Sequence, residues 1–545
     1  MQRSNSLVLL GSVLVGATLW IAGLTTEPFH ANDSYDYAQM GREIRLGHGF
    51  STLQAFPRHL AFLEERGLLD QPHWPNLYRY PLPTLLHAAA QSVAPDFVWA
   101  AVLQTGVWYV GSLPLFFLLA RRFSTPLIGA ALTLVFATDP LVRQSGYNGH
   151  TEALAIFLLL AALWLAFEAE RSVAHRVALG VVCGLAFLNR TQAALLVPLV
   201  LFYVAARTPR GARLRSLLPV LGAAGLTLLP WALRDLDVVG QPLFSLNSTR
   251  NLFKQGRLDM DMMLHAPTSL ERLLTLHGTE IRDQFLDYAR RIFWVSEWKR
   301  MFPPLVYLPL LALWILALPI RRQDGSGFDT FKWGALGLFV ASFLLHCLTV
   351  RNARVWAPMR PMILLAGAGS LVGLLPRSHP VASAWLARLL ATALVVFAAF
   401  QLGPSLAATA PPGATQARVE KRLAPICDRL PGGAIVASDR SAEVALYCDR
   451  RSVRLPWKPG ELLEMDRRLV PIDFVYASGR MSRPRGTNPR RNLYYQRYVE
   501  SGFLEGRKFQ DRYRPIVDTP EGGTLYRRRE PQAAADEFSR RGSGG

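Results

Sequence analysis

Charged residues are scarce in this chain. Asp, Glu, Lys and Arg make up 18% of its 545 residues, whereas soluble globular proteins carry about 25%. Hydrophobic residues make up 50%, and the mean hydropathy is +0.17. A soluble globular protein is therefore excluded for the chain as a whole.

Charge is scarcest inside long apolar runs. The hydrophobic residues come in blocks of roughly 12–24, the pattern of helices that cross a bilayer. We expect about 11 such helices, several of them tilted because they are short, and we place the short stretch 82–94 at the membrane interface. The blocks are 7–24, 97–120, 127–137, 153–167, 177–188, 193–206, 217–233, 304–320, 331–350, 355–375 and 384–402.

Few charges fall in the middle of these blocks. Transporters and proton pumps keep ionisable residues near the bilayer midplane, so the scarcity argues against a transport path. The charges gather instead at block ends, which suits a site at the outer boundary that acts on a lipid-anchored molecule. Those expected on the outer side are Asp33, Asp36, Asp139, Arg143, Glu152, Arg190, Arg234, Arg351, Arg354 and Arg360.

The net charge of +20 comes without any nucleic-acid-binding motif, so no nucleic-acid partner is expected. Short loops rich in Lys and Arg mark the cytoplasmic side of a membrane protein. Arg121, Arg122, the run 207–215 and the group 321–332 share one side if the N-terminus is cytoplasmic. That topology requires 177–188 and 193–206 to form a hairpin. We therefore expect a multi-pass protein of the inner cell membrane.

Three regions then face outward. A membrane domain, 1–402, carries outer loops 25–95 and 234–302. Residues 403–530 are expected to form a small extracytoplasmic α/β domain with strands at AIVAS, SVRLPW, FVYAS and TLYRR, and 531–545 is typical of a disordered tail. Cys427 and Cys448 are the two cysteines of this domain. In an oxidising compartment they could pair, and two unpaired thiols are the alternative.

The stretch NDSYDYAQMGREIRLGHGF, residues 32–50, follows the first apolar block. Asp33 and Asp36 are three residues apart and share one face of a helical turn. One carboxylate can serve as a general base while the other binds a hydroxyl group or a metal ion. Capping of the helix is the alternative role for Asp33.

This stretch, together with YRYPLPTLLHA at 78–88, resembles the first outer loop of GT-C superfamily glycosyltransferases, which include protein O-mannosyltransferases and lipid A aminoarabinose transferases. The acidic residue, tyrosine, G-x-G turn and Y-P step of that loop correspond to Asp33, Tyr37, Gly47, Gly49, Tyr80 and Pro81. DPLVRQSGYNGHTEAL, GLAFLNRTQAALLVP, LPWALRDLDVVGQPLFS and RNARVWAPMRPMILL resemble later segments in the same order. Ser34 stands where many members have a second acidic residue.

The resemblance implies a sugar donor linked to polyprenyl phosphate, used on the outer leaflet with inversion at the anomeric carbon. Asp33 would be the general base, with Asp36 beside it, and Glu152 would orient the acceptor or the base. The leaving lipid phosphate needs cations more than a general acid. The candidate phosphate ligands are Arg190, Arg234, Arg351 and Arg354, and the candidate sugar or acceptor ligands are Tyr37, Tyr80, Asn148 and His150.

Three alternatives stay open: a ligase of oligosaccharides or polymers with the same architecture, a lipid-carrier transporter or flippase, and an assembly protein without catalysis. The acceptor is a lipid, a glycan or a protein, and membrane lipids surround the helices. No cofactor is expected. Ser34 and the sparse carboxylates favour transfer without a metal ion, and a divalent cation is the alternative.

Overall fold

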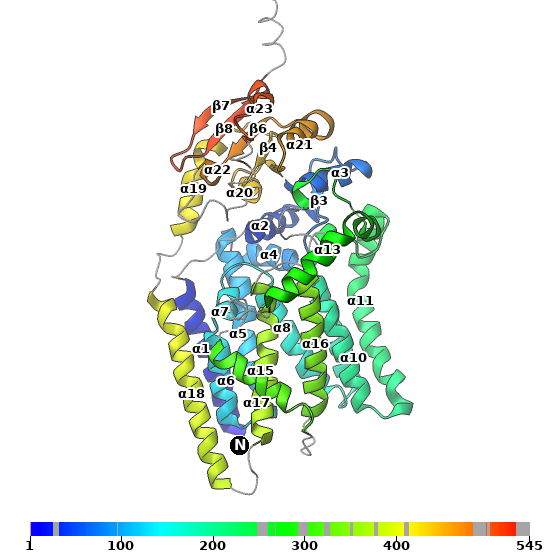
Figure 1. Ribbon diagram of the computed structural model, residues 1–545, viewed down its shortest axis with the longest axis vertical. Coiled ribbons are helices and arrows are strands. Elements are labelled where there is room, and N and C mark those ends of the chain that lie inside the picture. Colours follow the sequence, from blue (N-terminus) through cyan, green and yellow to red (C-terminus); the bar gives the residue numbers. More distant parts are fainter. Residues whose placement is uncertain are drawn as a thin grey trace, which may run out of the picture. The chain divides into compact units, whose positions relative to one another are not determined.

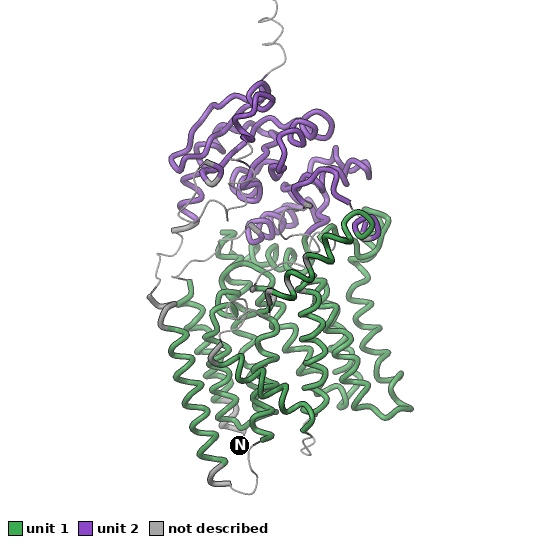
Figure 2. The backbone as a smooth tube through the Cα atoms, in the orientation of Figure 1, with its two compact units in different colours: residues 1–30, 79–255, 274–413 green, residues 31–78, 256–273, 414–545 purple. Residues whose placement is uncertain are grey.

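The structure, a computed structural model, describes residues 2–24, 32–94, 96–247, 260–267, 269–292, 304–320, 327–348, 353–374, 380–407, 414–482, 498 and 502–529. The chain divides into two compact units, coloured separately in Figure 2. The first unit contains residues 1–30, 79–255 and 274–413. The second contains residues 31–78, 256–273 and 414–545.

The first unit is a bundle of long helices that run side by side (Figure 1). Its α-helices are α1 (Gln2–Leu24), α4 (Pro81–Val93), α5 (Phe97–Phe123), α6 (Pro126–Thr138), α7 (Pro140–Ser145), α8 (Glu152–Glu168), α9 (Val173–Asn189), α10 (Leu196–Arg207), α11 (Arg213–Val239), most of α13 (Leu270–Ile292), α15 (Pro304–Leu316), α16 (Phe328–Leu348), α17 (Arg360–Leu374) and α18 (Pro380–Ala407). Short 3-10 turns connect several of them: η1 (Thr191–Leu195), η2 (Arg210–Ala212) and η5 (Ala353–Met359).

Every apolar block predicted from the sequence coincides with one of these helices. Six segments in the described part of the chain are long and apolar enough to cross a membrane. They are Leu7–Leu24, Phe97–Phe123, Arg210–Val239, Phe328–Leu345, Trp356–Leu374 and Ser383–Leu402. Because the other apolar helices are shorter, the structure supports a polytopic protein, and the number of crossings stays a prediction.

Side-chain caps fix where several helices begin. Asp96 accepts hydrogen bonds from the backbone N–H groups of Val98 and Trp99 at the start of α5, at 2.8 and 2.9 Å. Thr125 and Ser172 cap α6 and α9 in the same way. These residues satisfy donors that a helix N-terminus leaves unpaired, which matters most where water is absent.

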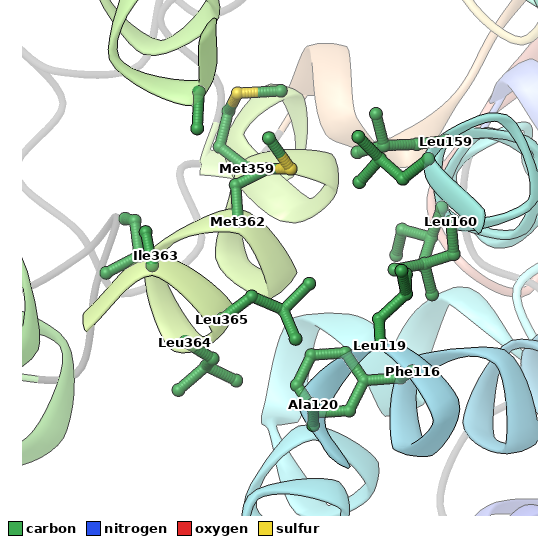
Figure 3. Packing of buried hydrophobic residues seen from close by; sticks show 14 of the residues in the cluster. Phe116, Leu119, Ala120, Leu159, Leu160, Met359, Met362, Ile363, Leu364 and Leu365 are labelled. Carbon is green, nitrogen blue, oxygen red and sulfur yellow. The ribbon is translucent and has the colours of Figure 1, made fainter. Parts of the chain in front are cut away.

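The core of the bundle is apolar and closely packed. Figure 3 shows side chains of α5, α8 and α17 next to one another, including Phe116, Leu160 and Leu365, all of them buried. Helices α9 and α11 also pack tightly, because Gly180 of α9 has no side chain and its backbone can approach the carbonyl oxygen of Val220 in α11. Close approach at small residues is how helices gain contact in a bilayer.

Charged pairs mark one end of the bundle. Arg122 at the end of α5 lies 3.0 Å from Glu168 at the end of α8. Arg207 at the end of α10 lies 2.5 Å from Glu170, which precedes α9. The chain therefore returns through α10 to the end where α9 began, and the predicted hairpin is confirmed. The opposite end contains Gly146, whose carbonyl accepts a hydrogen bond from Trp20 near the end of α1.

The second unit is built on a six-stranded sheet in the order β2-β5-β4-β6-β8-β7. Strands β2, β5, β4 and β6 are parallel, and β8 and β7 are antiparallel. The strands are β2 (Gln54–Ala55), β4 (Ile435–Ser438), β5 (Arg451–Arg454), β6 (Phe474–Ala477), β7 (Tyr513–Asp518) and β8 (Thr524–Arg528), with a separate antiparallel pair of β1 (Ser51–Thr52) and β3 (Trp74–Pro75). Its helices are α2 (Asn32–Arg45), α3 (Pro57–Glu65), α19 (Ala414–Cys427), α20 (Ser441–Tyr447), α21 (Pro459–Glu464), α22 (Gly479–Ser482) and α23 (Arg507–Arg512), with the turns η4 (Met260–Met262) and η6 (Met465–Leu469).

The four strands predicted in the C-terminal region are confirmed as β4, β5, β6 and β8. The sequence missed β2, which comes from the first loop and pairs with β5 at Gln54 and Ala55. The compact unit around the sheet therefore includes 31–78 as well as the C-terminal region, which differs from the predicted boundary at 402–403. Cys427 and Cys448 form a disulfide. The predicted tail, 531–545, lies outside the described residues.

Candidate active site

Glu152 is the centre of a buried polar cluster in the first unit. It occupies the first turn of α8, and its Oε1 atom lies 3.0 Å from Nη1 of Arg190. Arg190 has extended backbone angles between the end of α9 and η1, so its side chain leaves the helix and reaches α8. A buried carboxylate needs such a partner, because moving an unpaired charge from water into the protein interior costs several kcal/mol of free energy.

The turn before α8 is fixed by local hydrogen bonds. Oδ1 of Asn148 accepts from the backbone N–H of His150 at 2.9 Å, and Gly149 has φ +70°, a conformation that favours glycine. Nε2 of His87 lies 3.2 Å from the carbonyl oxygen of Gly149. Burial lowers the pKa of His87 to about 4. His87 is thus a neutral donor at physiological pH, and the turn presents His150 in one orientation.

Arg354 contacts the ring of His150 through Nη1, which binds Nδ1 and lies 3.3 Å from Nε2. Oε2 of Glu152 lies 3.6 Å from the same Nδ1 atom. Within the described residues, this buried carboxylate oxygen accepts no hydrogen bond. It is available to a substrate hydroxyl group.

The loop that carries Arg190 is held from a second side. The hydroxyl group of Tyr80 lies 2.9 Å from Oγ1 of Thr191, the residue after Arg190. The side-chain amide of Asn247 donates to the same tyrosine hydroxyl at 3.1 Å. Tyr80 itself is fixed at the N-terminus of α4, directly before Pro81. In this structure Tyr80 positions the arginine loop.

A cavity of about 80 Å³ lies beside Arg190. Its walls come from α8, α9, η1, α10, α16 and η5. Most of the lining is apolar, and the polar members are Arg190, Gln192 and Ser342. An apolar cavity with a guanidinium group in its wall suits an amphiphile that has a hydrocarbon chain and an anionic head.

A second buried ion pair lies at the start of α7. Asp139 caps α7, accepts from the hydroxyl group of Tyr307 at 2.8 Å, and pairs with Arg360. These partners give Asp139 a structural role. Arg143, one turn further along α7, is buried, and its Nε and Nη1 atoms make no hydrogen bond to the described part of the chain.

The other sequence candidates fall in three places. Arg234 pairs with Asp235 at 2.7 Å and stacks on Trp231 near the end of α11. Arg351 lies outside the described residues. Asp33, Asp36 and Tyr37 belong to the second unit, in the first turns of α2, where Asp33 is half-buried and the other two are buried.

The structure thus brings together five of the predicted residues: Asn148, His150, Glu152, Arg190 and Arg354. Tyr80 contacts Thr191, the residue that follows Arg190. The sequence missed His87 and Thr191, because an isolated His or Thr in an apolar stretch carries no pattern. Only the resemblance of the neighbouring segments could have drawn attention to them.

Comparison with known proteins gives the family and the fold that this chain resembles. The family model of dolichyl-phosphate-mannose-protein mannosyltransferases matches residues 75–233, which include Glu152 and Arg190. ArnT from Cupriavidus metallidurans bound to undecaprenyl phosphate is similar over 95% of this chain and 97% of that chain, with a TM-score of 0.58 at 14% identity. The likeness in fold extends over nearly the whole of both chains.

Two further proteins are similar to this chain, one in structure and one in sequence. The archaeal oligosaccharyltransferase AglB from Archaeoglobus fulgidus, in complex with an inhibitory peptide and a dolichol-phosphate, has a TM-score of 0.60 at 14% identity, over 97% of this chain and 74% of that chain. The undecaprenyl phosphate-alpha-4-amino-4-deoxy-L-arabinose arabinosyl transferase 1 of Pseudomonas fluorescens is 28% identical over 367 residues. That match covers 60% of this chain and about half, 53%, of the curated relative. The structural likeness therefore shows that the chain has the GT-C fold.

Proposed function

We propose that the chain is a glycosyltransferase that moves a sugar from a polyprenyl-phosphate-linked donor to an acceptor hydroxyl group at the outer face of the inner membrane. The supporting observation is the cluster of buried Glu152 and His150 with half-buried Arg190 and Arg354, beside an apolar cavity. The cavity suits part of the isoprenoid chain, and the guanidinium groups suit its phosphate. The similar ArnT structure is bound to undecaprenyl phosphate, and the similar AglB structure is in complex with a dolichol-phosphate.

The proposed reaction is an inverting displacement. The carboxylate of Asp33 takes the proton of the acceptor hydroxyl group as its oxygen attacks the anomeric carbon. The bond between that carbon and the phosphate oxygen breaks, and its electron pair stays on the phosphate. Arg190 and Arg354 stabilise the added negative charge, so no general acid is needed. The Oε2 atom of Glu152, which accepts no hydrogen bond from the described residues, accepts one from a substrate hydroxyl group.

We place the second unit outside the cytoplasm. The Cys427–Cys448 disulfide supports this placement, since such bonds persist mainly in oxidising compartments. We infer about 11 crossings from the apolar blocks and a cytoplasmic N-terminus from the arginine-rich loops. We also propose that the transfer step itself uses no metal ion, as Ser34 beside Asp33 leaves no adjacent second carboxylate.

The test is Asp33→Asn in a deletion strain. The variant should insert and fold normally, but the strain should still accumulate the lipid-phosphate sugar, because an amide cannot take the proton. Asp511→Asn is the matched control, since that aspartate belongs to the same unit, is 70% exposed and lies 4.0 Å from Arg507. Near-normal transfer by Asp33→Asn would count against the assigned base. Mass analysis of the product separates transfer of one sugar from transfer of an oligosaccharide.

A further inference from the structure

Three potential metal ligands to which no role in transfer is assigned converge in the second unit. They are Glu43 near the end of α2, His48 in the following turn, and His73 directly before β3. Oε2 of Glu43 lies 2.8 Å from Nδ1 of His48 and 2.9 Å from Nδ1 of His73. Both imidazole rings therefore direct the same nitrogen at one carboxylate oxygen.

The backbone builds this convergence. Gly47 has φ +83°, and the turn it forms lets the N–H of His48 donate to the carbonyl of Glu43 at 2.9 Å. His73 arrives from 25 positions further along the chain, where β3 pairs with β1 through Trp74 and Thr52. The two rings stack with their centroids 3.9 Å apart. The helix end and the strand pair thus hold both histidines beside one carboxylate.

The carboxylate is buried and oriented. The Glu43 side chain is 1% exposed, and Glu is almost never so buried unless it is paired. Arg42 lies 3.4 Å from its Oε1 atom and is fixed by Asp449 at 2.7 Å and by the carbonyl of Leu446 at 2.9 Å. Oε2 is left for the histidines. Such an outer contact, holding a ligand in one orientation, is usual around metal ions in proteins.

One nitrogen of the cluster is not satisfied by the part of the protein that the structure describes. Nδ1 of His73 is buried and makes no hydrogen bond with good geometry to any described residue, although Oε2 of Glu43 is 2.9 Å away. A hydrogen bond between Nδ1 of His73 and Oε2 of Glu43 would need the N–H to point at the oxygen, and it does not. A metal ion bound to both atoms does not need that alignment. The His48 and His73 side chains are 37% and 29% exposed, so solvent reaches the cluster.

We propose that Glu43, His48 and His73 bind a zinc-like divalent transition metal. Two imidazoles and one carboxylate form a known three-ligand zinc set, with the fourth position left for water. At zinc–ligand distances of about 2.0–2.2 Å the ligand atoms stand about 3.3 Å apart, so the observed 2.8 and 2.9 Å separations open by about half an ångström. Bound metal would join the end of α2 to the strand pair and stiffen the first loop. The proposal does not depend on the transfer reaction.

The experiment measures metal content in full-length protein, purified in detergent with an affinity tag that contains no histidine. The protein is stripped with a chelator, loaded with Zn²⁺ and desalted. We expect about one zinc per chain for the wild type and at least a tenfold loss in His48→Gln and His73→Gln. His265→Gln is the matched control, because His265 lies 3.2 Å from Glu464 in the same unit without a third ligand in reach among the described residues.

Hydrogen exchange gives a second readout that does not depend on stoichiometry. Zn²⁺ should slow amide exchange around residues 43–75 in the wild type and in His265→Gln, but not in His48→Gln. Mg²⁺ should have no such effect, since it prefers oxygen ligands. Equal zinc retention in the wild type and His48→Gln overturns the proposal, as does protection by Mg²⁺.

Discussion

The contact between Arg190 and Glu152 allows the proposed phosphate site to be tested without knowing the sugar. Every donor of this class shares the lipid carrier, so binding of undecaprenyl phosphate to the purified protein is the quantity to measure. The perturbations are Arg190→Gln, Glu152→Gln and the double variant. The ion pair is 3.0 Å long, and its side chains are 16% and 7% exposed, so both charges are largely removed from water.

A hydrogen bond to a charged group contributes about 1.5–3 kcal/mol, which corresponds to about 10- to 150-fold in affinity. If Arg190 binds the phosphate, Arg190→Gln should weaken binding by this factor. Glu152→Gln should weaken it by about tenfold at most, because the arginine remains but is less well oriented. The double variant should then resemble Arg190→Gln alone, giving a coupling energy of about 1 kcal/mol.

A purely structural ion pair predicts a different pattern. Each single variant would then lower the unfolding temperature, because it leaves one buried group without its partner, and the double variant would recover part of that loss. Carrier binding by the folded fraction would stay unchanged. Arg207→Gln is the control, since Arg207 makes a similar pair with Glu170 at the opposite end of the bundle. Weakening of carrier binding in Arg207→Gln equal to that in Arg190→Gln would refute the reasoning.

Two further predictions concern stability. Gly180→Ala should destabilise the bundle by about 1–3 kcal/mol in a thermal unfolding assay, because its Cβ atom would collide with the carbonyl oxygen of Val220. Gly222→Ala is the control. Because open space surrounds Gly222, this variant should be neutral or slightly stabilising in the same assay. The double variant Cys427→Ser/Cys448→Ser should lose about 3 kcal/mol, the chain-entropy value for a loop closed across 21 positions. Denaturant unfolding of the wild type should shift to match that variant when a reductant is added, and an unchanged midpoint would contradict a stabilising disulfide.

Local pattern was sufficient for the apolar helices and for four of the eight described strands, β4, β5, β6 and β8. Apolar runs had to become helices, because a bilayer offers no partners for an unpaired backbone. The strands β4, β6 and β8 were visible as short β-branched and aromatic segments. Strand β2 has two residues and no pattern of its own, so nothing in its sequence indicated that it extends the sheet beside β5.

The candidate site was only partly accessible from the sequence. Glu152 and Arg190 could each be selected as a charge at the end of an apolar run. Their pairing joins residues 38 positions apart, and the contact between His150 and Arg354 spans 204 positions. No periodicity relates such positions, since helix packing brings them together only after the chain has folded.

The sequence by itself determined that this chain is a polytopic helical protein with its charges at the helix ends, because the free energy of placing charge in hydrocarbon forbids other arrangements. Tertiary structure alone decided which charges meet. Glu152 pairs with Arg190, Asp139 pairs with Tyr307 and Arg360, and Glu43 lies beside two histidines. These outcomes depend on how helices and strands distant in sequence pack, and packing is a property of the whole fold.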